Sequence, residues 1–229
     1  MKISVIIPVC NLEKVITNCL DSIEMQNFDK SEYEIIIILD SCSDNSENVI
    51  REWYSTHGAV NLNIFYAQCG TPGGARNIGL DMAEGDYILF VDGDDYLVNI
   101  HAMTILYNAV QGHNAVRVMD HEVSGNHVKF SQRLTLWLHF FSRRLIGKER
   151  FSDMLLNEDF DFVKRIRNKP EYNEVQIQES LYHYNYDENR MLQRIMNVMR
   201  VSAERRRQGL PALYVDDEFV VDNSKNIGG

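Results

Sequence analysis

The stretch TPGGARNIGLDMAEGDYILFVDGDDYL, residues 71–97, contains the elements that decide the fold. A glycine-rich turn enters a short helix within 71–83, and the apolar run that follows predicts a strand over 86–92. Because this run is apolar throughout its middle, the strand is expected to be buried on both faces of a sheet. It ends on a cluster of acids around one glycine: Asp92, Gly93, Asp94 and Asp95.

Strands of the same kind precede this stretch. Runs rich in isoleucine and valine predict buried strands over 3–9 and 33–40, and a further apolar run predicts a third strand over 62–67. Helical patterns separate these runs. Strands that alternate with helices and are apolar along their length are typical of a parallel sheet. The sequence therefore predicts an α/β fold with a mostly parallel sheet flanked by helices.

From about residue 113 the regular alternation of strands and helices changes. Before that point, Asp44 and Glu47 match the spacing of a capping box, which predicts a helix from there to about Tyr54. Residues 121–130 resemble a short hairpin that turns at residues 124–126. The segment 151–166 is expected to be helical.

Asp40 and Asp92 each stand at the end of a predicted strand. In open parallel sheets, ligands bind in the crevice beyond the carboxyl ends of the strands, so we expect both carboxylates to face one crevice. The three acids within 92–95 would repel one another there. A divalent cation, Mn²⁺ or Mg²⁺, would relieve the repulsion, since these metals bind one or two carboxylates together with substrate phosphates. An ordinary aspartate–glycine turn is the alternative for the same residues.

Two features near the acids favour an anionic ligand. Gly93 would let a bulky ligand approach the backbone closely. The glycine-rich turn within 69–79 would offer free N–H groups and the positive end of a helix to an anion, and Arg76 adds a planar guanidinium suited to phosphate. Glycine-rich turns also serve plain packing, so this stretch alone does not decide between the two uses.

Composition limits the class of protein. The chain has 229 residues and a formal net charge of −10, which argues against a nucleic-acid partner because such proteins usually carry a basic surface. Its four cysteines show no C-x-x-C spacing, and buried, reduced thiols in a cytoplasmic protein are expected. No apolar segment is long enough to cross a membrane, and the first apolar run is too short for a signal peptide.

At this point the sequence resembles a known family. The segments SVIIPVCNLEKVITNCLDSI, IILDSCSDNS, GTPGGARNIGLDMAEGDYILFVDGDDYL and NEDFDF stand in the order found in family 2 inverting glycosyltransferases of the GT-A fold. The resemblance covers about residues 3–185, and its most specific part runs from ARNIGL to VDGDD. It implies a metal-dependent enzyme that moves a sugar from a nucleotide-diphospho-sugar, expected to be a UDP-sugar, to the hydroxyl of a glycan or lipid-linked acceptor.

On the donor side, the resemblance implies contacts to the nucleoside and its base. Pro8 and Val9 would lie against the nucleoside, and Asp40 would recognise the base, which is usually uracil. The sequence departs from the family pattern here, because Leu39 precedes Asp40 and Ser41 replaces the usual glycine. The identity of the base is therefore open at this point.

The same resemblance implies how the diphosphate and the metal are bound. Arg76 would lie near the diphosphate. Asp92 and Asp94 would form the D-x-D motif, in which Asp94 binds Mn²⁺ or Mg²⁺ directly and Asp92 lies nearer the ribose and the metal. Gly93 would belong to the donor site between them, and Asp95 would hold the loop.

On the acceptor side, NEDFDF (157–162) resembles the family's catalytic segment. Asp159 would be the general base that takes the proton from the acceptor hydroxyl, so that a single displacement inverts the sugar, and Glu158 would orient it or pack nearby. A solvated acidic helix face is the alternative for these residues. Trp137 would line the acceptor pocket or serve as a core tryptophan. His183 stands where some members carry a histidine that touches the metal, although a structural histidine is the commoner case.

The chain is expected to be a single domain with a small C-terminal acceptor lobe. Its parts would be a nucleotide-sugar-binding half, an acceptor-binding half, and a C-terminal helix and tail, over 1–112, 113–187 and 188–229. The segment 188–208 has methionines on one face with arginines near it, a pattern that fits a membrane surface, a partner helix or the core. The acceptor half is short for the family, which would also fit a homo-oligomer in which another copy completes the site.

Three other readings compete with the transferase. A phosphatase of the haloacid dehalogenase type also ends a strand on D-x-D, but there the motif follows the first strand and continues with threonine, whereas here it follows the fourth. A nucleotidyltransferase shares the metal and the nucleotide, but its basic glycine-rich signature near the N-terminus is absent. A catalytically silent protein of the same fold that binds nucleotide-sugars is opposed by the presence of Asp92, Asp94 and Asp159.

Overall fold

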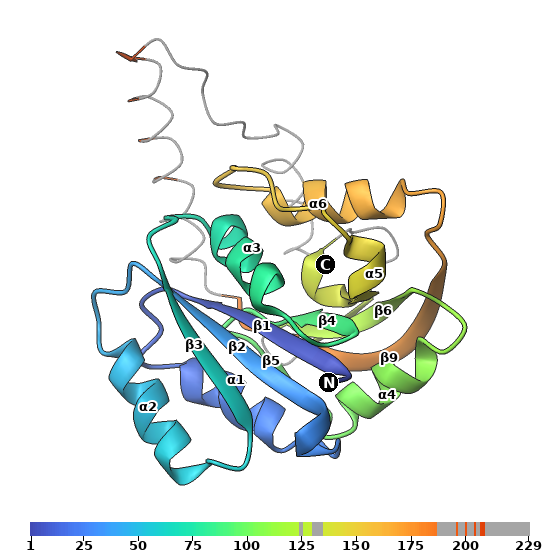
Figure 1. Ribbon diagram of the computed structural model, residues 1–229, viewed down its shortest axis with the longest axis horizontal. Helices are drawn as coiled ribbons and strands as arrows, with labels where there is room; N and C mark the ends of the chain where they lie inside the picture. The colour runs from blue at the N-terminus through green and yellow to red at the C-terminus, as the bar shows by residue number, and fades with distance from the viewer. Residues whose placement is uncertain are drawn as a thin grey trace.

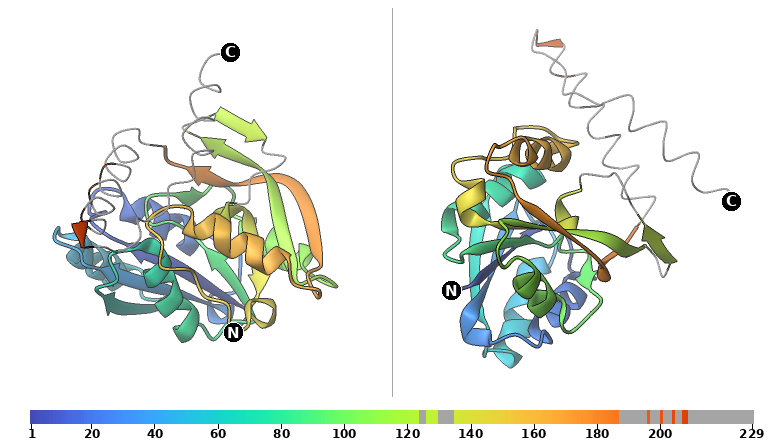
Figure 2. Two further views of the ribbon diagram at one scale, coloured as in Figure 1. Left: turned by 90° about the horizontal axis from the view of Figure 1, so that it is seen from above. Right: turned by 90° about the vertical axis from the view of Figure 1, so that its right-hand side faces the viewer.

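The computed structural model describes residues 1–123, 126–129 and 135–186, together with five single residues near the C-terminus. These five are Met196, Arg200, Glu204, Arg207 and Gln208. The described chain folds into one mixed sheet with helices on both faces, as Figures 1 and 2 show. This confirms the predicted α/β fold.

The elements have the following bounds. The strands are β1 (Ile3–Val9), β2 (Tyr33–Asp40), β3 (Asn61–Ala67), β4 (Tyr87–Phe90), β5 (Tyr96–Leu97), β6 (Ala115–Val123), β7 (Asn126–Lys129), β8 (His139–Ser142) and β9 (Glu174–Tyr184). The helices are α1 (Ile16–Glu24), α2 (Ser46–Thr56), α3 (Pro72–Met82), α4 (Ala102–Ala109), α5 (Arg143–Ile146) and α6 (Glu158–Arg167). Two short 3₁₀ helices are η1 (Lys30–Glu32) and η2 (Leu136–Leu138).

The sheet runs in the order β3-β2-β1-β4-β8-β6-β9-β5, and β7 pairs with β6 outside this path. The first four strands are parallel, which matches the apolar runs read from the sequence. The later strands pair mostly antiparallel, apart from the parallel pair of β6 and β9. The parallel half therefore comes from the first 90 residues of the chain, and the later strands extend the same sheet.

Each face of the sheet has its own apolar core. Ile3, Val5 and Ile7 of β1 point toward α1, α2 and α4, while Ile6 points toward α3 and α6. This alternation follows from the two-residue period of a strand, and covering helices on both faces explain why β1 and β2 are apolar at successive positions. Helix α3 lies close against β1 because Gly79 has no side chain: a Cβ there would come within 2.4 Å of Ile6 Cγ2.

The predicted capping box at the start of α2 is wrong. The helix begins at Ser46, whose backbone N–H donates to Asp44 Oδ1 at 3.0 Å. Glu47 does not reach back to complete the box, because its Oε1 accepts hydrogen bonds from Tyr66 Oη at 2.6 Å and Arg51 Nε at 2.8 Å. A tertiary contact with β3 thus replaces the local one.

The predicted helix over 151–166 is wrong in its first half. Helix α6 begins only at Glu158, after Asn157 takes the left-handed conformation with φ 63°. The chain before it is tied to α3 instead, since Phe151 N donates to Asn77 Oδ1 at 2.7 Å and Asn77 Nδ2 donates to Phe151 O at 3.0 Å. The left-handed residue sharply turns the chain into the helix, which places the acids of NEDFDF in its first turn.

Other expectations have mixed outcomes. The hairpin is confirmed in its strands, since β6 and β7 pair antiparallel, whereas residues 124 and 125 of its turn lie outside the described residues. All four cysteines are free, but only Cys19 is buried, and Cys10 and Cys69 are exposed. Most of 188–208 also lies outside the described residues. Within the described part of the chain, no helix has both the length and the apolar character needed to span a membrane.

A buried carboxylate joins three segments at the amino end of the parallel strands. Glu34 of β2 is 2% exposed, and its Oε1 accepts hydrogen bonds from Ser4 Oγ at 2.7 Å and from Glu84 N at 2.8 Å. Asn63 Nδ2 of β3 donates to its Oε2 at 3.3 Å. Ser4 Oγ in turn accepts from Gly85 N at 2.8 Å. The carboxylate therefore fixes the turn between α3 and β4 against the sheet.

We expect Glu34→Ala to lower the free energy of unfolding by about 1.5–3 kcal/mol, because it leaves buried donors without their charged acceptor. Urea unfolding monitored by circular dichroism measures the change. Glu32→Ala is the matched control, since Glu32 forms only a solvent-accessible ion pair with Lys2 at 3.5 Å and should matter much less. Equal losses in the two variants would contradict this role of Glu34.

Candidate active site

The carboxyl ends of the parallel strands bring the predicted donor residues to one edge of the sheet. Asp40 is the last residue of β2, and Asp92 follows the end of β4 by two positions. β1 lies between these two strands and ends at Val9. Val91 N donates to Ile6 O at 3.1 Å, which extends the alignment of β1 with the chain leaving β4. The parallel register thus places Asp40 and Asp92 at the same edge.

Arg76 joins two of the acid clusters. Its Nη2 donates to Asp92 Oδ1 at 2.6 Å, and its Nη1 donates to Glu158 Oε1 at 3.0 Å. The side chains of Arg76 and Glu158 are 6% and 3% exposed, and that of Asp92 is 28% exposed. Burial by itself would lower the pKa of Arg76, but the charges of Asp92 and Glu158 raise it above its ordinary value. The guanidinium is therefore a fixed positive charge between the two carboxylates.

The start of α3 explains why Arg76 points there. Thr71 caps the helix by accepting from Gly74 N at 3.1 Å, and Pro72 occupies the first turn, so Arg76 lies on the second turn. Gly73 allows α6 to come close, because a Cβ there would lie 3.1 Å from Glu158 Cγ and 3.0 Å from Phe151 Cβ. The glycine-rich turn therefore serves packing between α3 and α6 in the described structure.

Asp159 follows Glu158 in the first turn of α6 and is half-buried. Burial, together with the negative charge of Glu158, raises the pKa of Asp159 to about 6, and the positive charge of Arg76 opposes this rise. A carboxylate with such a pKa is ionised near neutral pH and still basic enough to accept a proton. Asp159 is therefore a candidate general base.

The acid loop, residues 92–95, is hydrogen-bonded to the end of β9 and to the residue that follows it. Asp95 is 1% exposed, and its carboxylate accepts hydrogen bonds from Tyr182 Oη and Asn185 N, both at 2.8 Å. Burial raises the pKa of Asp95 well above its ordinary value, and the charges of Asp92 and Asp94 raise it further. Burial beside two further carboxyl groups therefore disfavours the ionised form of Asp95.

Gly93 has a packing role that was not expected from the sequence. It is buried, and a Cβ there would lie 2.8 Å from Leu12 Cδ1 and 3.2 Å from both Ile16 Cδ1 and Pro8 O. The space beside Gly93 is therefore filled by the protein itself. The missing side chain lets the acid loop lie against the chain that leaves β1.

The acid loop suits a metal that arrives together with its substrate. Across residues 1–123 and 135–186, no group of three or more His, Cys, Asp or Glu side chains is placed to hold a metal ion. The loop offers Asp92 and Asp94, both half-buried, beside the buried Asp95. One or two carboxylates, with the other positions left to phosphate and water, are a normal set of protein ligands for Mg²⁺ or Mn²⁺. The residues present fit such a cation.

Asp40 links β2 to the loop that leads into α3. It is 5% exposed, and its Oδ1 accepts hydrogen bonds from Cys69 N at 2.7 Å and from Gly70 N at 3.2 Å. Val9 is buried and Pro8 is half-buried at the end of the neighbouring strand β1. Asp40 thus fixes the backbone of the β3–α3 loop beside the edge where β1 ends.

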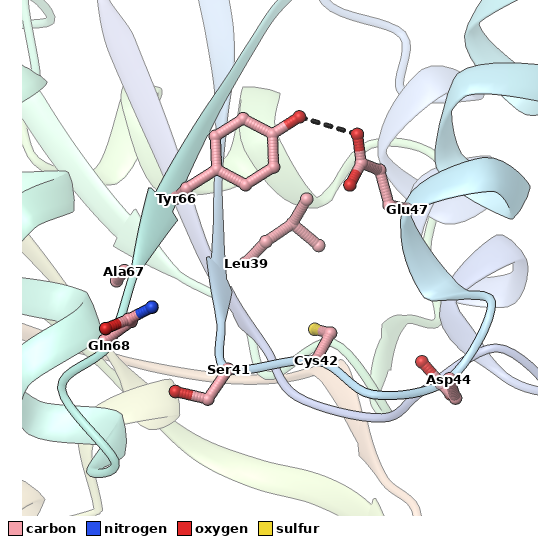
Figure 3. A pocket seen from close by; sticks show the side chains of 8 residues that line it. All are labelled: Leu39, Ser41, Cys42, Asp44, Glu47, Tyr66, Ala67 and Gln68. Atoms are coloured by element: carbon pink, nitrogen blue, oxygen red, sulfur yellow. Dashed lines mark hydrogen bonds between the residues drawn. The ribbon is translucent and has the colours of Figure 1, made fainter.

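A cavity of about 440 Å³ lies at the carboxyl ends of β2 and β3 (Figure 3). Its lining comes from β2, β3 and the start of α2: Leu39, Ser41, Cys42, Asp44, Glu47, Tyr66, Ala67 and Gln68. Tyr66 Oη donates to Glu47 Oε1 at 2.6 Å across one side of it. Leu39 and Ser41, the two residues that depart from the family pattern, therefore both line this cavity.

Trp137, which was expected to line an acceptor pocket or to belong to the core, is part of an aromatic stack. Its ring lies 4.9 Å from that of Tyr182 and 5.6 Å from that of Tyr184, with interplanar angles of 18° and 3°. His183 points elsewhere: its ring stacks on Tyr96 at 4.3 Å, and its Nδ1 lies 3.6 Å from Glu122 Oε2. The alternation along β9 therefore separates Trp137 and its tyrosines from His183.

The sequence did not reveal two residues that hold the acid loop: Tyr182 in β9 and Asn185 directly after it. Tyr182 and Asn185 lie about ninety positions after the residues that they bind. The only sequence signal was the aromatic alternation in SLYHYNY, residues 180–186. This pattern is typical of a strand but does not indicate which loop the strand will meet.

Comparison with known proteins identifies the family. Glycosyl transferase family 2 matches residues 4–167, which is more than half of the chain. The chain belongs to this family. The resemblance to family 2 glycosyltransferases that the sequence motifs indicated is therefore confirmed, and so is the expected GT-A-like fold.

Curated relatives match only a part of the chain. A poly(ribitol-phosphate) beta-glucosyltransferase from Bacillus spizizenii is 41% identical over 97 residues, which cover 42% of this chain and 15% of the relative. The GalNAc(5)-diNAcBac-PP-undecaprenol beta-1,3-glucosyltransferase from Campylobacter jejuni is 32% identical over 114 residues, which cover 49% of this chain and 36% of the relative. The matched part is thus a minor fraction of each relative.

Solved structures extend the likeness to most of the described fold. Residues 1–349 of TarS from Staphylococcus aureus, solved in complex with UDP-GlcNAc, superpose with a TM-score of 0.72 and 26% identity, over 82% of this chain and 59% of that one. The mannosyltransferase PcManGT from Pyrobaculum calidifontis, solved with GDP-Man and Mn²⁺, superposes with a TM-score of 0.66 over 82% of this chain and 57% of that one. At 17% identity, the second likeness concerns the fold alone.

Proposed function

We propose that this chain is a metal-dependent inverting glycosyltransferase that moves a hexose or N-acetylhexosamine from a UDP-sugar to a hydroxyl of a glycan or lipid-linked acceptor. The observation that carries this proposal is the bridge made by Arg76 between Asp92 and Glu158, at 2.6 Å and 3.0 Å. It holds the acid loop beside the first turn of α6, although the two carboxylates are far apart in the sequence.

The choice of donor rests on the relatives. The TarS structure contains UDP-GlcNAc, and the Bacillus spizizenii relative is named a glucosyltransferase. Within this chain, Pro8 and Val9 would lie against the nucleoside, and Asp40 would meet the base. The buried position of Asp40 beside the β3–α3 loop is consistent with that role. Gly93 would shape the donor site by keeping the acid loop close to β1.

Asp94 and Asp92 would hold Mn²⁺ or Mg²⁺ together with the donor diphosphate. When bound, the cation would neutralise charge on the departing nucleoside diphosphate. Arg76 would stabilise this subsite through the protein and not through the ligand, since two of its nitrogens already donate to Asp92 and Glu158. It would thereby hold Asp92 in one orientation and bring positive charge close to the diphosphate.

Asp159 would act as the general base. Its carboxylate would take the proton of the acceptor hydroxyl while the hydroxyl oxygen attacks the anomeric carbon and the bond from that carbon to the diphosphate breaks. One displacement inverts the configuration of the sugar. Glu158, paired with Arg76, would fix the helix turn that carries Asp159.

The acceptor would bind over the half of the chain within 113–187, with residues 1–112 forming the donor half. Trp137 would contribute an aromatic surface to the acceptor pocket, since it packs on the edge of the core, is only half-buried, and stacks on Tyr182 and Tyr184. Relatives act on polymeric poly(ribitol-phosphate) or on an undecaprenol-linked glycan, and both are candidate acceptor classes for this chain.

Donor cleavage tests the proposed function. Wild-type protein incubated with UDP-glucose or UDP-GlcNAc is expected to release UDP with Mn²⁺ and not with EDTA. Release of inorganic phosphate would instead indicate a phosphatase. If the donor binds but no UDP forms with any acceptor from a panel of polyol-phosphate and lipid-linked glycans, the chain is a silent binding protein and the proposal is wrong.

Asp94→Ala should abolish the metal-dependent part of donor binding, because it removes the carboxylate that would bind the cation directly. Isothermal titration calorimetry with UDP, in Mn²⁺ and in EDTA, measures this part as the difference between the two affinities. Asp86→Ala is the control, since Asp86 is an exposed carboxylate just before the amino end of β4. Full metal-dependent affinity in Asp94→Ala would show that the cation is bound elsewhere.

A further inference from the structure

The acid loop is fixed by one buried tyrosine and one asparagine from the end of β9. Tyr182 Oη donates to Asp95 Oδ2 at 2.8 Å and accepts from Asp92 N at 3.1 Å. Asn185 N donates to Asp95 Oδ1 at 2.8 Å, and Asn185 Nδ2 donates to Asp94 O at 3.2 Å. All three aspartates of the loop are therefore contacted by these two residues.

The strand pairing makes these contacts rigid. β5 follows the acid loop directly and pairs antiparallel with β9, with Tyr96 opposite His183 and Leu97 opposite Tyr182. The Tyr182 ring is 2% exposed and stacks on Trp137 at 4.9 Å. A ring that is buried, stacked and paired in a strand has little freedom, so its hydroxyl has one fixed position.

The hydroxyl is used as both donor and acceptor, and both uses fall on the acid loop. The donated bond holds the buried side chain of Asp95 in place. The accepted bond satisfies the backbone N–H at the residue where the chain leaves the sheet. Without the hydroxyl, the Asp95 side chain would lose its hydrogen bond to Tyr182 and Asp92 N would lose the bond that fixes it, so the loop would be held less firmly.

We infer that Tyr182 and Asn185 are positioning residues for the donor site: they hold the acid loop so that Asp92 and Asp94 present their carboxylates to one divalent cation. This inference rests on the proposed function. It adds that the preformed metal subsite depends on the acceptor half of the chain, because both residues come from the end of β9. The residues do not touch the substrate themselves and act through the loop.

The test is the affinity for Mn²⁺ in the presence of saturating UDP, measured by electron paramagnetic resonance of free Mn²⁺. Tyr182→Phe keeps the ring and the stack but removes the hydroxyl, and we expect the dissociation constant to rise about tenfold. Asn185→Ala removes the bond to Asp94 O and should raise it about threefold or more, as expected for one lost hydrogen bond.

Tyr33→Phe is the matched control. Tyr33 is fully buried, and its hydroxyl donates to Ile23 O at 3.3 Å in the core below α1. The control should lose thermal stability without any change in the affinity for Mn²⁺. A merely structural role of Tyr182 would produce the same pattern in Tyr182→Phe.

The outcomes separate the inference from the proposed function. If wild-type protein binds no Mn²⁺ in the presence of UDP, the proposed metal-dependent function fails and the inference fails with it. If wild type binds the metal and Tyr182→Phe binds it equally well, or Tyr33→Phe is weakened as much, the inference alone is overturned. If Tyr182→Phe does not fold, Asn185→Ala decides: a wild-type dissociation constant in that variant overturns the inference.

Discussion

Asp159→Asn should lower the turnover number by about 10²–10⁴-fold, the usual contribution of a general base. The amide has nearly the same shape as the carboxylate but cannot take a proton from an acceptor hydroxyl. Affinity for UDP and Mn²⁺ should stay as in wild type, because the acid loop and Arg76 are unchanged. Release of UDP in the steady state measures turnover, and calorimetry measures binding.

The pH profile provides a second readout of the same residue. Because the pKa of Asp159 is raised to about 6, turnover by wild type should decline as the pH falls through that value and the base becomes protonated. Asp161→Asn is the control: Asp161 lies in the same helix turn but accepts hydrogen bonds from Ser152 Oγ at 2.7 Å and Arg165 Nε at 3.0 Å. If Asp159→Asn turns over at the wild-type rate, the base lies elsewhere.

Arg76→Met is expected to lower the free energy of unfolding by about 3–5 kcal/mol, as when one partner of a buried ion pair is removed. The change leaves Glu158, 3% exposed, without its positive partner and removes the contact of the guanidinium with the Phe151 ring. Affinity for UDP with Mn²⁺ should also fall, because Asp92 loses the bond that orients it. Urea unfolding and calorimetry measure the two effects.

Two further variants show whether the loss of stability in Arg76→Met comes from breaking the bridge between Asp92 and Glu158. Arg51→Met breaks an ion pair of similar length, 2.8 Å to Glu47, that lies on the surface, and it should change stability little. The double variant Arg76→Met with Glu158→Gln should regain part of the lost stability, because the unpaired buried charge is gone, but not the donor affinity. Equal losses in Arg76→Met and Arg51→Met would contradict the buried bridge.

The sequence predicted the parallel half of the sheet because that half depends on local patterns. The strands predicted over 3–9 and 33–40 have the bounds of β1 and β2. Strands buried on both faces must be apolar at successive positions, so their pattern is visible without knowledge of their neighbours. Ligands meet the carboxyl ends of such strands, and this rule singles out Asp40 and Asp92 from the sequence alone.

The rest of the site depends on contacts between distant segments. Arg76 was expected near a diphosphate, but nothing in its sequence context indicates Glu158, which is 82 positions away. The start of α6 is set by the left-handed conformation of Asn157, which a helical pattern over 151–166 does not reveal. Tyr182 reaches the acid loop only because β5 pairs with β9, and a two-residue strand leaves almost no signal in the sequence.

The central claim is that one displacement, with Asp159 as base and a cation at the acid loop, inverts the transferred sugar. Proton NMR tests it most directly by following the first sugar released to water from α-linked UDP-GlcNAc or UDP-glucose in the presence of Mn²⁺. The β anomer should appear first, and its release should stop in EDTA and in Asp159→Asn. Appearance of the α anomer first, or equal release in EDTA, would contradict this account of the reaction.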